Sequence, residues 1–279
     1  MPKVVKEALI NAVNEDKTVY TENAGILPLR KEISKYLMNK GIDYSADEIC
    51  ITVGGSEAIF TIFTALINRG DNVLIPTPAY PAYENIVNIL GGNVVSYGLN
   101  DDFSINIESL KALIKENEIK VLVLSLPSNP LGTILTKEEK EDLIKIINDN
   151  NILVVTDEIY ESLIYEDYYS VAQHKDILDK VIYISGFSKM FSMTGLRVGY
   201  FAAEKKLMDE IMKEYEGKVD GIYLYANDSV LDFYPKFGFV TKPEFQYSKH
   251  VINTATDVTE NIPMETSEDW VKMVDIIKT

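Results

Sequence analysis

The segment VIYISGFSKMFSMTGLRVGY, residues 181–200, carries the most structural information in this sequence. It opens with a short apolar run, Val181–Ser185, which is typical of a strand buried on both faces. A loop with Lys189 follows, and a second predicted strand, Val198–Ala202, closes the segment. A lysine at the end of a buried strand, beneath apolar neighbours, is placed to attack a carbonyl and form a Schiff base. Because a loop lysine is usually only a solvated charge, this interpretation depends on the residues around it.

Up to about residue 205, the chain alternates apolar runs with segments of helical period. This alternation predicts an α/β fold, a three-layer αβα sandwich with a mainly parallel seven-stranded sheet, in which ligands bind at the carboxyl ends of the strands. The spacing of Thr136 and Glu139 is that of a capping box at the start of a helix over Lys137–Asp149. We expect strands at Glu48–Val53, Asn72–Pro76, Asn93–Tyr97, Val121–Leu126, Ile152–Asp157, Val181–Ser185 and Val198–Ala202, and further helices at Lys3–Asn14, Leu27–Asn39, Glu57–Asn68, Tyr83–Leu90 and Ile107–Asn117.

Composition excludes several classes of function. The 279 residues include 27 Lys plus Arg against 43 Asp plus Glu, a net charge of −16, which argues against nucleic-acid binding. No apolar run is long enough to span a membrane, and the N-terminal residues do not resemble a signal peptide, so we expect a cytoplasmic protein. Cys50 is the only cysteine, and His174 and His250 are the only histidines. Disulfides, a metal site and Ser-His-Asp catalysis are therefore not expected.

A carboxylate, a phenol and an amide follow two of the predicted strands. Asp157 ends an apolar strand, where a carboxylate needs a cation or a donor, and a protonated pyridine nitrogen is one such partner. Tyr160 and Asn129 could hydrogen-bond the same ligand. Each has an ordinary alternative, because Asp157 could cap a helix, Tyr160 could pack in the core and Asn129-Pro130 could form a turn.

A second group of residues suits a phosphate. Gly54-Gly55-Ser56 precedes a predicted helix, and the backbone amides and dipole of a helix N-terminus favour a dianion. Arg197 could bind the same phosphate through two hydrogen bonds. A Gly-Gly turn alone is common, so this signal gains weight only in combination with the others.

In combination, these residues resemble the fold-type-I, class I/II pyridoxal-phosphate aminotransferases, and in particular the subgroup with bacterial and archaeal aspartate and aromatic aminotransferases. The resemblance covers residues 1 to about 212, which we expect to form the large domain of that family. It rests on VYTENAG (19–25), TVGGSEA (52–58), PTPAYPAYE (76–84), PSNPLGT (127–133), TDEIYE (156–161) and SGFSKMFSMTGLRVGY (185–200).

The resemblance implies that pyridoxal 5′-phosphate is the cofactor. Lys189 would form the Schiff base and move the proton between the substrate and the cofactor. Asp157 would keep the pyridine nitrogen protonated, Tyr160 and Asn129 would hydrogen-bond the ring oxygen, and Tyr80 would stack on the ring. Of these residues, Lys189, Tyr160 and Asp157 are the candidate catalytic set.

The resemblance also implies how the phosphate is held and how the chain assembles. Gly55, Ser56 and Arg197 would bind the phosphate, with Ser188 as a further contributor. Tyr20 matches a tyrosine that in this family reaches the phosphate of the neighbouring subunit, which implies a homodimer.

Two parts of the family pattern are missing from this sequence. Family members begin earlier, with a segment that closes over the substrate. Their small domain carries an arginine for the substrate carboxylate, whereas the only arginines here are Arg30, Arg69 and Arg197. We therefore expect a chain truncated at both ends relative to the family, with impaired substrate binding.

The remaining segment, 213–279, contains IYLYANDSVLDFYPKFGF (222–239), which resembles a C-terminal fragment of a GNAT N-acetyltransferase. We expect a short α+β appendage there, with an irregular tail as the alternative. The leading function is transfer of an amino group from an L-amino acid to a 2-oxo acid. A non-catalytic cofactor-binding or interaction module and an acetyltransferase are the alternatives, and the GNAT pyrophosphate loop that the latter requires is absent from the sequence.

Overall fold

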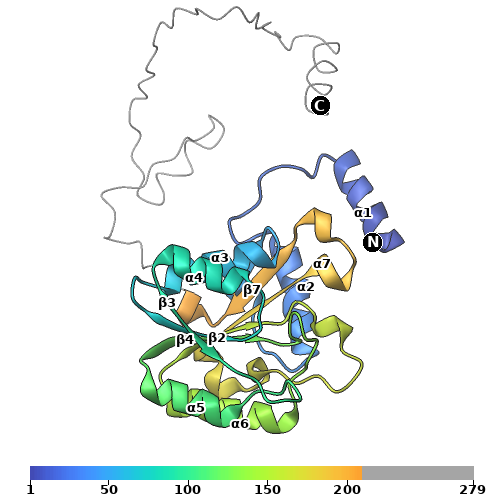
Figure 1. Cartoon of the computed structure of the whole chain (residues 1–279). Coiled ribbons are helices and arrows are strands. Elements are labelled where there is room, and N and C mark those ends of the chain that lie inside the picture. The colour runs from blue at the N-terminus through green and yellow to red at the C-terminus, as the bar shows by residue number, and fades with distance from the viewer. Residues whose placement is uncertain (209–279) are drawn as a thin grey trace, which may run out of the picture. The chain divides into compact units, whose positions relative to one another are not determined.

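A seven-stranded sheet organises residues 1–208, the part of the chain that this computed structural model describes (Figure 1). The strand order across the sheet is β1-β7-β6-β5-β4-β2-β3. The strands are β1 (Ile49–Thr52), β2 (Asn72–Pro76), β3 (Asn93–Tyr97), β4 (Ile119–Ser125), β5 (Leu153–Asp157), β6 (Val181–Gly186) and β7 (Gly199–Ala203). All seven lie where the sequence predicted them, with ends that differ by at most two residues.

One strand runs against the others. β7 pairs antiparallel with both β1 and β6, whereas every other neighbouring pair is parallel. The six remaining strands therefore end at one edge of the sheet, and the residues just before β7 lie at that same edge. This reversal brings Arg197 to the residues that follow the other strands.

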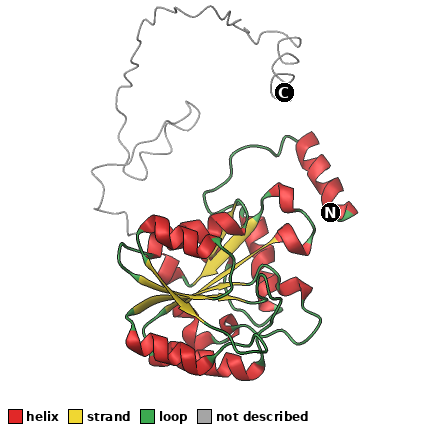
Figure 2. Cartoon of the chain, viewed as in Figure 1, coloured by secondary structure: helices red, strands yellow, loops and turns green. Residues whose placement is uncertain are grey.

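Helices cover both faces of the sheet, as the alternating sequence predicted (Figure 2). On one face lie α3 (Gly55–Leu66) and α4 (Ala82–Leu90), and on the other lie α2 (Leu27–Met38), α5 (Ile107–Glu116) and α6 (Lys137–Asp149). The predicted capping box of α6 is confirmed, because Glu139 N donates to Thr136 Oγ1 and Thr136 N donates to the Glu139 carboxylate. The described chain also contains α1 (Lys3–Asn14), the short α7 (Phe187–Met190), and 3-10 turns at Ala46–Glu48, Glu161–Leu163, Val171–Gln173, Lys175–Lys180 and Thr194–Leu196.

Alternating side chains of the central strands build two separate cores. In β4, Val121 and Val123 pack in the core under α3 and α4, whereas Leu122 and Leu124 pack in the core on the other face. All four are essentially inaccessible to solvent. A strand buried on both faces must be apolar at every position, which explains the continuous apolar runs in the sequence.

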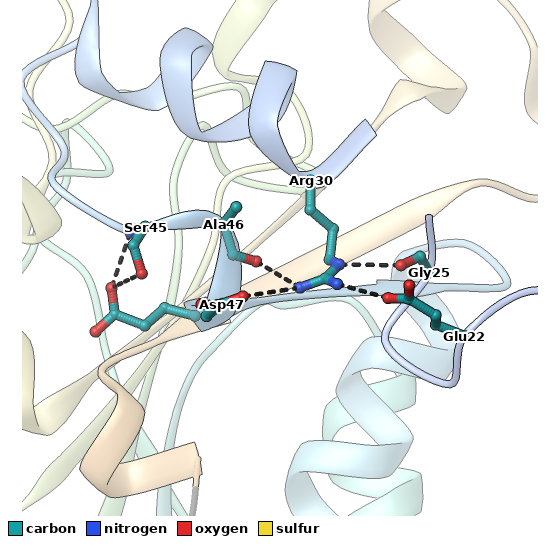
Figure 3. A network of polar contacts seen from close by, with 7 residues as sticks. Glu22, Gly25, Arg30, Ser45, Ala46 and Asp47 are labelled. Carbon is teal, nitrogen blue, oxygen red and sulfur yellow. Dashed lines mark hydrogen bonds and ion pairs between the residues drawn. The ribbon is translucent and has the colours of Figure 1, made fainter. Parts of the chain in front are cut away.

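Arg30 at the start of α2 fixes the chain segment that precedes this helix (Figure 3). Its side chain is buried, and it donates to Gly25 O at 3.0 Å, to Ala46 O at 2.9 Å and to the Glu22 carboxylate at 2.8 Å. The same segment pairs with the outer edge of β1, where Ile51 N donates to Ala24 O. Arg30 therefore holds this segment in place along the outer edge of β1.

Within residues 1–208, none of the helices combines the length and the hydropathy that crossing a bilayer requires. The predicted domain boundary near residue 212 and the predicted appendage at 213–279 lie outside the described residues.

Candidate functional site

A cavity of about 220 Å³ opens at the carboxyl edge of the sheet. Nine of the ten residues that the sequence predicted to bind a cofactor line it, and the tenth, Tyr20, does not. The cavity is lined by Gly55, Ser56, Ile59, Tyr80, Tyr83, Ser125, Asn129, Asp157, Ile159, Tyr160, Ser188, Lys189, Thr194 and Arg197.

The sheet topology explains why residues far apart in sequence meet here. Asp157 is the last residue of β5, and Asn129 follows β4 by four positions. Lys189 lies in α7, directly after β6, and Gly55 opens α3 after β1. Arg197 completes the set from the loop before the antiparallel strand β7.

Asp157 is a buried carboxylate without a cationic partner. Its side chain accepts hydrogen bonds from the Tyr83 hydroxyl at 2.7 Å and from Ile159 N at 3.2 Å, and across residues 1–208 no lysine or arginine pairs with it. Burial raises the pKa of Asp157, and the two hydrogen bonds oppose this rise only in part. A carboxylate in this state is stabilised by a cationic ligand group in the cavity.

Another part of the cavity lining, at the start of α3, is built to approach an anion closely. Gly54 has a φ of +80° at the N-cap of α3, and a Cβ placed on it would lie 2.4 Å from the Arg197 guanidinium. Gly199 of β7 passes beneath this turn, where a Cβ would lie 2.5 Å from the Gly54 carbonyl carbon and 2.6 Å from Gly55 N. The amides at the start of α3, the Ser56 side chain and Arg197 therefore converge on one small region that suits a phosphate.

Lys189 lines the same cavity as Asp157 and Arg197. Its Nζ is 5.4 Å from the centroid of the Tyr160 ring, and both residues line the cavity. The preceding residue, Ser188, is buried at 7% exposure and also faces the cavity. The amine and the phenol are thus near enough to act on one bound ligand.

Sequence reasoning missed Tyr83, which holds the carboxylate of Asp157. Tyr83 packs edge-on against Tyr80, with ring centroids 5.7 Å apart. A signal was present, because the two tyrosines stand three residues apart in PTPAYPAYE, a spacing that places them on one side of a helical turn. The other lining residues that the sequence did not reveal are Ile59, Ser125, Ile159 and Thr194.

Tyr20 lies between α1 and α2 with its side chain fully exposed. It precedes the Arg30-anchored segment, Glu22–Gly25, by two residues, and it does not line the cavity of its own chain.

A larger cavity of about 700 Å³ adjoins the first and shares Asn129 and Tyr160 with it. Its walls come from the loop after β4 and from residues 163–166. Asp102, Glu139 and Glu166 are the charged residues among its described lining.

These features together fit a ligand that carries a cationic nitrogen, a carbonyl and a phosphate. Asp157 suits the nitrogen, Lys189 suits the carbonyl, and Ser56, Arg197 and the start of α3 suit the phosphate.

Comparison with known proteins gives matches to one family. The sequence model of the family described as aminotransferase class I and II matches residues 1–218. A probable aspartate aminotransferase of Methanocaldococcus jannaschii is 38% identical over 212 residues, which are 75% of this chain and 56% of that protein. The aspartate aminotransferase of Geobacillus stearothermophilus is 37% identical over 234 residues, which are 81% of this chain and 59% of that protein.

Solved structures give the same result. The crystal structure of the aromatic aminotransferase from Pyrococcus horikoshii superposes with a TM-score of 0.72 at 33% identity, covering 76% of this chain and 58% of that one. The chain thus spans a little over half the length of the proteins that it matches.

Proposed function

The chain belongs to the aminotransferase class I and II family, and on this premise we propose that it binds pyridoxal 5′-phosphate at Lys189 and transfers an amino group from an L-amino acid to a 2-oxo acid. The family uses this cofactor. When bound, the cofactor supplies an aldehyde that links to amines and a protonated ring that withdraws electrons from the substrate Cα.

Each residue of the smaller cavity would bind a different part of the cofactor. Asp157 would hold the proton on the ring nitrogen, while Tyr160 and Asn129 would donate to the ring oxygen. Tyr80 would cover the ring face, and Lys189 would hold the aldehyde carbon and then move a proton at the substrate Cα. Ser56, Gly55, Ser188 and Arg197 would bind the phosphate.

One observation carries the proposal: a lysine amine, an unpaired buried carboxylate and an anion-binding turn line the same cavity. Without a shared ligand, the placement of each of these groups at one cavity would need a separate explanation. A single cofactor with a cationic nitrogen, a carbonyl and a phosphate would provide a partner for all three groups at once.

We further propose that the active assembly is a homodimer and that the substrate enters through the larger cavity. The exposed position of Tyr20 supports the dimer, because a side chain outside its own cavity is available to a neighbouring subunit. The shared residues Asn129 and Tyr160 support the entry route. A cytoplasmic location stays a prediction from the sequence.

The proposal is tested by the absorption spectrum of the full chain titrated with pyridoxal phosphate, followed by a panel of L-amino acids. We expect a new visible band on cofactor addition and its conversion by at least one amino acid. A band that no amino acid converts would leave a cofactor-binding protein without transamination, and the absence of a band in folded protein would refute the proposal.

We predict that Gly199→Ala weakens cofactor binding by at least tenfold, or about 1.4 kcal/mol. The new Cβ would meet backbone atoms of Gly54 and Gly55. These atoms cannot move without displacing the turn at the start of α3 that is proposed to bind the phosphate. Gly195→Ala is the matched control from the turn that precedes β7, because a Cβ there meets nothing within 4 Å. Equal dissociation constants for the two variants in a fluorescence titration would contradict the role assigned to this turn.

A further inference from the structure

Glu158 is a buried carboxylate that lies next to the proposed cofactor site. It stands between Asp157 and Tyr160 in the sequence, yet it does not line the cavity that they share. Successive residues of a strand point to opposite faces, so Asp157 meets Tyr83 of α4 while Glu158 points to the other side of the sheet. Its side chain is buried, at 2% exposure.

Three hydroxyl groups converge on the Glu158 carboxylate. Thr156 Oγ1 donates at 2.9 Å, Ser170 Oγ donates at 2.5 Å, and the Tyr168 hydroxyl donates to the second oxygen. Ser170 Oγ also accepts from Ala172 N at 3.1 Å, which leaves its own proton free for Glu158. The carboxylate thus joins the end of β5 to a point in the chain twelve residues beyond it.

The segment that this carboxylate closes, residues 158–170, forms walls of both cavities. Ile159 and Tyr160 line the cofactor cavity, and residues 163–166 line the larger one. A second anchor lies within the segment, where buried Glu161 pairs with Lys40 and accepts from the Tyr36 hydroxyl.

We propose that Glu158 is a positioning residue for the cofactor site, which fixes Tyr160 by holding the hydroxyls of Thr156, Tyr168 and Ser170 around one carboxylate. The inference rests on the proposed cofactor function. Glu158 itself lies outside the cavity, and it acts by holding in place the segment that carries Tyr160.

The hydrogen bonding of Glu158 to the three hydroxyls should depend on pH. Burial raises the pKa of Glu158 to about 7, and the three hydrogen bonds limit this rise. The ionised carboxylate accepts all three hydroxyl protons, whereas the protonated form must itself donate, so that one hydroxyl has to turn away. The segment is therefore held most firmly above neutral pH.

Other titratable groups surround Glu158 on every packed element. They are Glu161 in the following turn, Tyr36 in α2, Lys40 just after α2, Tyr168 in the closed segment, Tyr183 in β6, Tyr200 in β7, and Tyr44 before β1. Burial keeps the pKa of each of these tyrosines above its ordinary value, so these phenols stay neutral in the neutral range.

The test measures binding of 4′-deoxypyridoxine phosphate between pH 6 and pH 8.5 by the wild-type chain and by Glu158→Gln. This probe lacks the aldehyde, so Lys189 forms no covalent bond to it, and its own titration is the same with both proteins. We expect wild-type affinity to rise about fivefold relative to Glu158→Gln as the pH increases through 7. The control Asp167→Asn removes a carboxylate from an exposed site in the same segment and should follow the wild-type profile.

Two further variants keep the test decisive if Glu158→Gln does not fold. Ser170→Ala and Tyr168→Phe each remove one hydrogen bond that favours the ionised carboxylate. Each should move the midpoint of the pH dependence upward, which loss of packing alone would not do. Parallel profiles for all variants would overturn the inference while leaving the proposed function intact. Failure of the wild-type chain to bind the probe at any pH would refute both.

Discussion

Lys189→Ala is expected to abolish covalent attachment of pyridoxal phosphate. The wild-type chain, incubated with the cofactor and reduced with borohydride, should gain the mass of one reduced cofactor per chain, and the variant should gain none. Lys189 is the lysine that lines the cavity holding Asp157 and Arg197, so no other described lysine can take its place. The cofactor affinity of the variant should fall at least tenfold, because only the ring and phosphate contacts remain.

Lys31→Ala is the matched control for this experiment, since Lys31 lies on the exposed side of α2. It should bind and retain the cofactor as the wild-type chain does. Borohydride-stable labelling of Lys189→Ala at the wild-type level would show that another amine carries the cofactor, and the assignment of Lys189 would then be wrong.

Asp157→Asn is expected to raise the stability of the cofactor-free chain and to lower its affinity for the cofactor. In the free protein, burial raises the pKa of Asp157, so the ionised carboxylate costs folding free energy at neutral pH. The neutral asparagine removes this cost and keeps a similar shape, so the cofactor-free variant should be about 1 kcal/mol more stable at pH 7. Cofactor affinity should change in the opposite direction, because the contact with a cationic nitrogen, worth about 1.5–3 kcal/mol, is lost.

The stability gained by Asp157→Asn should depend on pH. A carboxyl group with a raised pKa in the folded state carries no penalty below its unfolded pKa, and the penalty develops as the pH rises through the folded value. The stability difference between Asp157→Asn and wild type should therefore be near zero at pH 4 and grow towards pH 7, as measured by urea unfolding without cofactor. A variant that is less stable at pH 7 and unaltered in cofactor affinity would contradict the role of Asp157.

Much of the fold could be predicted from local pattern. The runs at 121–124 and 152–155 are apolar at every position because both sheet faces are covered, and the structure buries them accordingly. The start of α6 followed from the spacing of Thr136 and Glu139 alone, since a capping box involves residues only three positions apart. Strand ends shifted by up to two residues, because pairing with a neighbour decides where a strand stops.

The site was predicted less completely than the fold. Residues with reactive or charged groups stood out in the sequence, and nine of the ten predicted cofactor contacts line one cavity. Tyr83 and Glu158 did not stand out as site residues, since a tyrosine in a helix and a glutamate after a strand each have many ordinary roles. Their importance comes from the partners that the fold gives them, Asp157 for the first and three hydroxyls for the second.

The sequence by itself determined the α/β class, the seven strands and six longer helices of residues 1–208, the family resemblance and the identity of the reactive groups, because periodicity, caps and motifs are local properties of the chain. Only the tertiary structure decided that β7 runs against its neighbours, so that Arg197 before that strand meets Gly54 after β1. It alone also placed Glu158 behind the cavity wall with a pKa of about 7. Strand direction and the burial of single polar side chains such as Glu158 depend on contacts between segments far apart in sequence, and no local pattern records them.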